Sequence, residues 1–201
     1  MSRIAVLGTG TVGKAVGSKL TEVGHEVKMG TRSEGTYADA AAFGEIVVNA
    51  TPGTASLDAL AAAGAENLAG KTLWDIANPL DSSQGFPPSL TVANTDSLAE
   101  QIQRAHPDAK VVKALNTVTA AVMVEPALLG TQSNLFICGN EKSAKAQVIE
   151  ILETFGWLSG DIIDVGDITA ARGIEAYVLL WVRLMGALDT PNFNVQIVRP
   201  A

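Results

Sequence analysis

The feature that most constrains the fold of this chain is a glycine-rich turn near the N-terminus. The stretch GTGTVG at Gly8–Gly13 has the spacing G-x-G-x-x-G, follows the apolar segment Arg3–Leu7 and opens a segment of helical periodicity. This order is typical of the first unit of a dinucleotide-binding fold. Gly8 permits the tight turn, Gly10 lets the backbone approach a pyrophosphate, and Gly13 lets helix and strand pack closely. A glycine-rich turn without a ligand is the competing interpretation.

The rest of the chain alternates short β-rich segments with longer helical ones. Strands are expected at Arg3–Leu7, Glu26–Met29, Glu45–Ala50, Thr72–Ile76, Val111–Leu115, Leu135–Cys138, Asp161–Val165 and Phe193–Val198. Helices are expected at Lys14–Val23, Ala38–Phe43, Ser56–Ala63, Ser143–Phe155 and Ala170–Leu188, with one more that is capped by Asp96 or Ser97 and ends near Ala105. The alternation predicts the α/β class, with a Rossmann-type, doubly wound, mostly parallel sheet covered on both faces.

The only shift in composition lies near Gly166, where strands give way to one long helix and a last strand. We therefore expect a dinucleotide-binding domain at residues 1–165. Residues 166–201 are expected to form a small C-terminal helix-plus-strand appendage. The helix is too apolar for a lone surface helix, so we expect it to pack on the domain and on the partner of a homodimer.

Composition and charge exclude several classes of protein. The chain has 201 residues, 47% of them hydrophobic, so it can bury a core. A net charge of −7 without a cluster of Lys or Arg argues against nucleic acid as a partner. No signal peptide is evident, and the apolar stretch 174–188 contains Glu175 and Arg183 and is too short to cross a bilayer. We expect a cytoplasmic protein without a membrane partner.

The end of the expected second strand indicates which dinucleotide binds. NAD-binding folds usually carry a carboxylate there, which holds the adenosine ribose and repels a 2′-phosphate. Here the segment reads Thr31-Arg32-Ser33, and no acidic residue follows Met29 directly. A guanidinium and two hydroxyls can bind phosphate oxygens, so the sequence favours NADP(H). Alternatively, Arg32 is a solvated loop charge, or Glu34 pairs with it.

Several stretches together resemble a known family. In order they are GTGTVGKAVGSKL, GTR, NATPG, WDIANPL, VVKALNTV, LFICGN and DVGDITAARGIEAYVLLWVRL. They resemble the NADPH:F420 oxidoreductases, whose acceptor F420 is a deazaflavin, and relatives that include the NADPH domains of transmembrane ferric reductases. The resemblance covers nearly the whole chain. It implies an NADP-dependent oxidoreductase that passes hydride between NADPH and a deazaflavin or flavin.

The resemblance also implies site residues. The pyrophosphate would be held by Gly8, Thr9, Gly10, Thr11, Val12 and Gly13. The 2′-phosphate would lie against Thr31 and Arg32, and the cofactor would pass Ala50, Thr51 and Pro52. The nicotinamide would be lined by Ala77, Asn78, Pro79, Ala114, Leu115 and Asn116. These segments follow expected strands, and open parallel sheets bind ligands at the carboxyl ends of their strands.

The sequence offers no acid–base machinery, and we expect no catalytic side chain. His25 and His106 are interpreted as surface or capping residues, Cys138 as a buried apolar residue, and no spacing suggests a metal site. Hydride transfer between two rings needs mainly positioning and exclusion of water. Asp75 could contact a ligand or have a structural role.

The partner expected at this site is a small-molecule electron acceptor. Besides a deazaflavin or flavin, the acceptor could be a quinone or a ferric chelate, or the protein could be a non-catalytic NADP-binding sensor. The loop Asp81–Ser89 is either a lid that contacts the acceptor or an ordinary surface crossover.

Overall fold

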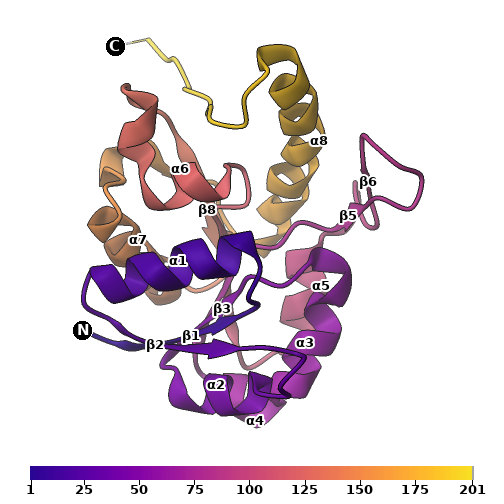
Figure 1. The fold of residues 1–201 in the computed structure, drawn as a ribbon, viewed down its shortest axis with the longest axis vertical. Coiled ribbons are helices and arrows are strands. Elements are labelled where there is room, and N and C mark those ends of the chain that lie inside the picture. Colours follow the sequence, from indigo (N-terminus) through magenta and orange to yellow (C-terminus); the bar gives the residue numbers. More distant parts are fainter. Residues whose placement is uncertain (201) are drawn as a thin grey trace.

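A seven-stranded sheet in the order β2-β1-β3-β4-β7-β8-β9 forms the centre of the computed structural model, which describes residues 1–200 (Figure 1). Its strands are β1 (Arg3–Leu7), β2 (Glu26–Gly30), β3 (Ile46–Asn49), β4 (Thr72–Asp75), β7 (Lys110–Ala114), β8 (Leu135–Gly139) and β9 (Ile162–Asp164). The strands from β2 to β7 in this order run parallel, and β8 turns antiparallel to β7. This arrangement confirms the predicted doubly wound, mostly parallel sheet.

Helices cover both faces of the sheet. One face carries α1 (Thr11–Glu22), α6 (Ala120–Val124) and α7 (Lys142–Thr154). The other carries α2 (Tyr37–Phe43), α3 (Ser56–Ala63), α4 (Ala65–Leu68), α5 (Leu98–Ala105) and α8 (Ala171–Leu188). Short 3₁₀ turns lie at Gly53–Ala55, Pro126–Leu129, Ser159–Asp161 and Ile168–Ala170.

The central strands are mostly apolar because they are buried on both faces. In β1, Ile4 and Val6 belong to one core cluster, whereas Ala5 and Leu7 belong to the other. Side chains alternate between the faces of a strand, so such a strand reads as a continuous apolar run. Asn49 in β3, Asp75 in β4 and Lys113 in β7 are the fully buried polar residues of these strands.

A small hairpin forms in the segment around Asp81–Ser89, for which the sequence predicts a loop. Strands β5 (Leu80–Asp81) and β6 (Ser89–Leu90) pair antiparallel, and the turn between them projects beside α8 (Figure 1). The predicted cap of α5 is Ser97, whose hydroxyl accepts a hydrogen bond from the Glu100 amide. The same hydroxyl donates to the Glu100 carboxylate at 2.8 Å, so both groups of Glu100 bind the Ser97 side chain.

The predicted strand at Phe193–Val198 is wrong. The part of the chain between Asp189 and Pro200 contains no strand. The Asn134 amide donates to the Val195 carbonyl, and the Ile197 amide donates to the Asn134 side chain. A strand needs a ladder of backbone partners, and the tail makes only one backbone–backbone hydrogen bond to the segment that precedes β8. The expected division of the chain near residue 165 stays a prediction.

Candidate functional site

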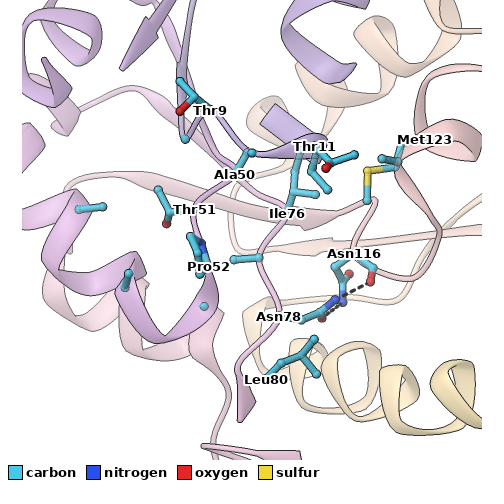
Figure 2. A pocket seen from close by; sticks show the side chains of 18 of the residues that line it. Thr9, Thr11, Ala50, Thr51, Pro52, Ile76, Asn78, Leu80, Asn116 and Met123 are labelled. Carbon is cyan, nitrogen blue, oxygen red and sulfur yellow. Dashed lines mark hydrogen bonds between the residues drawn. The ribbon is translucent and has the colours of Figure 1, made fainter. Parts of the chain in front are cut away.

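A cavity of about 1000 Å³ opens along the carboxyl ends of the parallel strands. Figure 2 shows part of its lining, with Thr9 and Thr11 from the glycine turn at one side and Asn78 and Asn116 at the other. The loops that follow β1, β2, β3, β4 and β7 all contribute to it, and α8 closes one wall. Open parallel sheets bind their ligands at this edge.

In the glycine turn, the strand, the loop and the helix approach one another so closely that side chains at the glycine positions would collide. Gly8 has φ +111°, and a Cβ there would lie 2.5 Å from the carbonyl oxygen of Ala50. A Cβ on Gly13 would collide with the carbonyl oxygen of Gly8. A Cβ on Gly10, in contrast, would meet no protein atom within 4 Å. Gly8 and Gly13 are therefore needed for the packing of the turn, whereas Gly10 leaves the backbone accessible beside the cavity.

The N-terminus of α1 faces this turn without a side-chain cap. Gly10 is the N-cap residue, in extended conformation, and no side chain accepts from the first turn. The amide groups of that turn carry a partial positive charge and point along the helix axis toward the loop. Such a helix start suits a phosphate group.

The loop after β2 forms the far end of the cavity. Thr31, Arg32 and Ser33 line it. The Thr31 amide donates to the Thr36 hydroxyl, and the hydroxyls of Thr31 and Ser33 lie 3.0 Å apart, so the loop is held by its own polar groups. Among residues 1–200 no ion pair joins Arg32 to a carboxylate, Glu34 included.

A buried row of polar side chains supports the floor of the cavity. Asn49, Asp75 and Lys113 stand in register on three adjacent strands. The side-chain amide of Asn49 donates to Asp75 Oδ1 at 2.8 Å, and Lys113 Nζ lies 2.7 Å from Asp75 Oδ2. At its other end Asn49 accepts from the Thr51 hydroxyl at 2.6 Å. Lys113 also donates to the carbonyl of Ala77, so the row holds the backbone of two lining segments.

The row continues to Glu175 on α8. Lys113 Nζ lies 2.9 Å from Glu175 Oε1, and the same carboxylate accepts from the amides of Leu98 and Ala99 at the start of α5. Burial alone would lower the pKa of Lys113, but the carboxylates of Asp75 and Glu175 outweigh burial and raise it. The ammonium group is therefore charged at neutral pH and lies between the two buried carboxyl groups.

The opposite end of the cavity is built around two asparagines. The Asn78 side chain donates to the Asn116 carbonyl at 2.8 Å, and the Asn116 side chain donates back to Asn78 Oδ1 at 2.9 Å (Figure 2). Leu115, with φ +69°, reverses the chain after β7 and brings Asn116 to the cavity. A non-glycine residue in this conformation is strained, which is frequent at functional sites.

Apolar side chains surround this asparagine end. Val178, Trp181 and Val182 project from one side of α8, and Leu80 and Met123 come from the segments that follow β4 and β7. The Trp181 ring stacks on Phe193 with centroids 5.3 Å apart, so the C-terminal tail braces this wall. The wall can hold a planar ring.

Thirteen of the residues expected at the site line the cavity. They are Gly8, Thr9, Gly10, Thr11, Val12, Thr31, Arg32, Ala50, Thr51, Pro52, Ala77, Asn78 and Asn116. Gly13, Pro79, Ala114 and Leu115 do not line it. The ligand roles assigned to all of these residues stay predictions.

Some lining residues were missed from the sequence. These are chiefly Ile76, Leu80, Thr117, Val118, Thr119, Ala120, Met123, Val178, Trp181 and Val182. No local pattern shows which side of α8 faces the cavity. The buried row had a signal, however, since Lys113 interrupts an apolar strand and Glu175 an apolar helix.

Neither histidine lies at the cavity. Burial lowers the pKa of both His25 and His106, so both are neutral at pH 7. Cys138 is buried in β8, and burial raises its pKa to about 12, which keeps the thiol protonated. Among residues 1–200, no helix is both long and apolar enough to cross a membrane.

Comparison with known proteins agrees with this geometry. No protein-family model matches the chain. A crystal structure from Arthrobacter sp. FB24, provisionally named an F420-dependent NADP-reductase, is 50% identical, with a TM-score of 0.95 over 99% of this chain and 100% of that one. A hypothetical protein from Sinorhizobium meliloti is 25% identical, with a TM-score of 0.64 over 87% and 90% of the two chains.

More distant structures share the fold alone. A reductive aminase from Aspergillus terreus, solved with NADPH, is 16% identical with a TM-score of 0.66. The match covers 94% of this chain but 63% of that one. The half-identical match over the full length of both chains is decisive, and this chain belongs to the family of F420-dependent NADP reductases, which are oxidoreductases.

Proposed function

We propose that this protein binds NADP(H) along the cavity and transfers hydride between the nicotinamide and a deazaflavin or flavin-type acceptor. The observation that carries the proposal is the order of groups along one continuous cavity. A helix start and glycine turn lie in the middle, Arg32 lies at one end, and a ring-sized apolar compartment lies at the other. NADPH carries its groups in the same order, with the 2′-phosphate at one end, the pyrophosphate in the middle and the nicotinamide ring at the other end.

At the nucleotide end, Arg32 distinguishes NADPH from NADH. Its guanidinium has no carboxylate partner within residues 1–200, and the hydroxyls of Thr31 and Ser33 stand beside it. A guanidinium can bind phosphate through two parallel hydrogen bonds. A ribose without the 2′-phosphate would leave this interaction unused.

At the opposite end, the protein positions two rings rather than supplying acid or base. The nicotinamide would lie between Ala77, Asn78 and Asn116, with the acceptor against the wall formed by Trp181 and its neighbours. When both cofactors carry the chemistry, the protein contributes orientation and a dry compartment. The neutral histidines lie outside the cavity, in agreement with this role.

The Arg32→Ala variant tests the nucleotide assignment. We expect the Kd for NADPH to rise by about 10- to 100-fold, the cost of a charge-assisted hydrogen bond of about 1.5–3 kcal/mol, while the Kd for NADH stays unchanged. Titration calorimetry measures both constants. Lys28→Ala is the matched control, because Lys28 is an exposed cation on β2 that does not line the cavity. An Arg32→Ala protein that keeps its full preference for NADPH would contradict the proposal.

A panel of acceptors tests the reaction. Oxidation of NADPH is followed by the loss of absorbance of the reduced nicotinamide, with F420, FMN, FAD, quinones and ferric chelates as acceptors. We expect turnover with F420 or a flavin. Turnover with quinone or ferric chelate alone would reassign the acceptor, and binding of NADPH without any turnover would favour a sensor.

We also infer a homodimer. On the side of α8 that faces away from the cavity, Leu180 is exposed by more than half of its surface and Leu179 by 40%. Apolar residues gathered on one side of a helix favour burial against another surface. A second copy that covers α8 would also stabilise the wall of the acceptor compartment.

A further inference from the structure

Both backbone polar groups of Ala77, in the segment that follows β4, are bound by the buried row. The Ala77 amide donates to Asp75 Oδ1 at 3.2 Å, and the Ala77 carbonyl accepts from the ammonium group of Lys113. Ala77 lines the cavity, as do its neighbours Ile76 and Asn78 (Figure 2). The buried charges therefore fix the backbone of a residue that borders the cavity.

Lys113 itself cannot contact a ligand. Its side chain has no exposed surface and does not line the cavity. An ammonium group has three N–H donors. Here they face Asp75 Oδ2 at 2.7 Å, Glu175 Oε1 at 2.9 Å and the Ala77 carbonyl. Lys113 can therefore influence a bound ligand only through the residues that it holds.

Through Lys113 the buried row joins two walls of the cavity. Glu175 lies on α8, and Val178, three residues further along this helix, lines the cavity. The Glu175 carboxylate is fixed in turn by the amides of Leu98 and Ala99 at the start of α5. A change at Lys113 would therefore alter the position of the segment after β4 relative to α8.

Lys145 forms a similar group away from the cavity. Its ammonium group lies 2.7 Å from the Asp164 carboxylate and donates to the Gly166 carbonyl at 3.0 Å. The Lys145 side chain is also buried, and none of these three residues lines the cavity. The chain thus contains two buried lysines that each join a carboxylate to a backbone carbonyl, and only that of Lys113 belongs to the cavity lining.

Stability alone does not call for a charge at position 113. Apolar side chains of similar volume can replace a whole buried group of charges without loss of stability, because taking charges out of water is costly. An ammonium group differs from an apolar side chain in that it binds a carbonyl oxygen at a defined distance through a strong, charge-assisted hydrogen bond. Lys113 therefore gives the Ala77 backbone one defined position.

From these contacts we infer that Lys113 is a positioning residue for hydride transfer. By holding the Ala77 backbone and Glu175 together, it fixes the place of the nicotinamide relative to the acceptor. The inference rests on the proposed function and names a further residue on which the rate depends. Reacting atoms must be close and aligned, and a misplacement of about 1 Å can lower a rate roughly 100-fold.

Lys113 takes no part in the chemical balance of the step. The C–H bond at C4 of the nicotinamide breaks, the hydrogen leaves with both electrons of the bond, and NADPH becomes NADP⁺. The acceptor ring forms a new bond to this hydrogen, is reduced by two electrons and takes a proton from water. The role of Lys113 is therefore geometric and differs from that of an acid or base.

The variant Lys113→Met removes the bond to Ala77 and keeps most of the side-chain volume. Hydride transfer to an acceptor found with the panel is measured in single turnovers by stopped flow, per bound NADPH and at a temperature at which the variant is folded. We expect a rate about 10- to 100-fold lower. The Kd for NADPH should stay within about threefold of that of the parent protein, because the phosphates are bound elsewhere. A rate within about threefold of the parent rate would overturn the inference.

Lys145→Met is the matched control. It also removes a buried ammonium group from a carboxylate and a carbonyl, but away from the cavity. We expect this variant to transfer hydride at the parent rate. An equal fall in rate in both variants would show that the loss of any buried lysine slows the reaction, and the inference would be wrong.

A double variant covers the case in which Lys113→Met does not fold. Lys113→Met alone leaves the carboxylates of Asp75 and Glu175 without a cation. Lys113→Met combined with Glu175→Gln leaves one carboxylate, so the buried row keeps the formal net charge that it has in the parent protein. We expect the double variant to fold and to transfer hydride as slowly as predicted for Lys113→Met. A folded double variant with the parent rate would overturn the inference.

The fluorescence of bound NADPH separates this inference from the proposed function. Its anisotropy reports how firmly the reduced nicotinamide is held and requires no acceptor. We expect a lower anisotropy for NADPH-saturated Lys113→Met than for the parent protein and Lys145→Met. If this difference is found but the parent protein reduces no acceptor, the proposed function is wrong and the positioning of the ring by Lys113 stands. If the parent protein reduces an acceptor and Lys113→Met equals it in rate and anisotropy, the inference alone is wrong.

Discussion

At the scale of single residues, the glycines of the turn differ in what surrounds them: two are packed against backbone and one borders the open cavity. Gly8 and Gly13 stand where a Cβ would strike backbone carbonyl oxygens, and Gly8 also requires a positive φ. Gly10 has φ −73° and ψ −174°, which any residue adopts, and has open space in the direction of a Cβ. The same sequence pattern therefore contains glycines required by close backbone packing, at Gly8 and Gly13, and a glycine with free space around it, at Gly10.

Paired alanine variants distinguish these requirements. Gly13→Ala should destabilise the protein by about 1–3 kcal/mol, because helix and strand must move apart. Gly10→Ala should leave the free energy of unfolding within about 0.5 kcal/mol and weaken NADPH binding, because a methyl group would occupy the approach of the pyrophosphate. Urea unfolding and calorimetric titration measure the two effects. Normal NADPH binding by Gly10→Ala would show that the pyrophosphate lies elsewhere.

Lys113 is the residue on which the buried row depends. It joins Asp75 on β4 to Glu175 on α8, and all three side chains are almost fully buried. Removal of one member of a buried charged group leaves uncompensated charge in the interior, at a typical cost of about 3–5 kcal/mol. We expect Lys113→Met to lose stability of this order in urea unfolding. Lys110→Met, on the same strand but partly exposed and without an ion pair, should change stability by less than about 0.5 kcal/mol.

At the scale of elements, α5 and α8 are joined by two charged contacts. Glu175 caps the start of α5, and Arg172 on α8 lies 2.6 Å from the Glu100 carboxylate on α5. The hydrogen bond from Arg172 is the main cause that lowers the pKa of Glu100, against burial, which raises it. Since α8 forms one wall of the cavity, these contacts set its position relative to the sheet.

The Glu100–Arg172 pair predicts a pH dependence. Glu100 has a folded pKa below its unfolded value of 4.5, so its contribution is complete above pH 4.5 and is lost as pH falls through the lowered pKa. Glu100→Gln should cost about 1 kcal/mol at pH 7, a modest value because Arg172 is partly exposed. This difference from the parent protein should shrink toward zero near pH 3. Urea unfolding between pH 7 and 3 measures it.

The control for this pair is an exposed carboxylate on another helix. Glu153 on α7 is exposed and makes no ion pair within residues 1–200. Glu153→Gln should follow the parent protein at every pH. A cost of Glu100→Gln that is the same at pH 7 and pH 3 would show that Glu100 acts by packing and not through its charge.

At the scale of the whole molecule, α8 presents different residues to its two sides. Val178, Trp181 and Val182 face the cavity, whereas Leu179 and Leu180 are exposed on the other side. A single helix therefore joins the wall of the cavity to exposed leucines on its outer side. A second copy of the chain would cover that surface and fix the wall in place.

The dimer is tested by Leu180→Asp. We expect the parent protein to elute as a dimer at micromolar concentration and the variant as a monomer, because a charge in an apolar interface costs several kcal/mol. Light scattering after gel filtration gives the mass directly. Leu128→Asp, an equally exposed leucine in the turn Pro126–Leu129, should remain dimeric. A monomeric parent protein would remove the dimer hypothesis.

The sequence by itself determined the fold class, the glycine turn and the absence of an acidic residue after β2. These features are local, because the spacing of glycines and apolar residues specifies turn, strand and helix without knowledge of distant contacts. The same local reasoning failed at the C-terminus. The segment FNVQIV alternates like a strand, but the fold offers it one backbone partner and no ladder.

Only the tertiary structure decided which distant residues meet. Lys113 and Asp75 are 38 residues apart in the chain, as are Asn78 and Asn116, and α8 returns from the end of the chain to close the cavity. The sheet order brings these groups to one edge, and no periodicity encodes that order. The cavity wall beside the glycine turn was therefore readable from local motifs, whereas the wall at Asn78 and Asn116 exists only where β4, β7 and α8 come together.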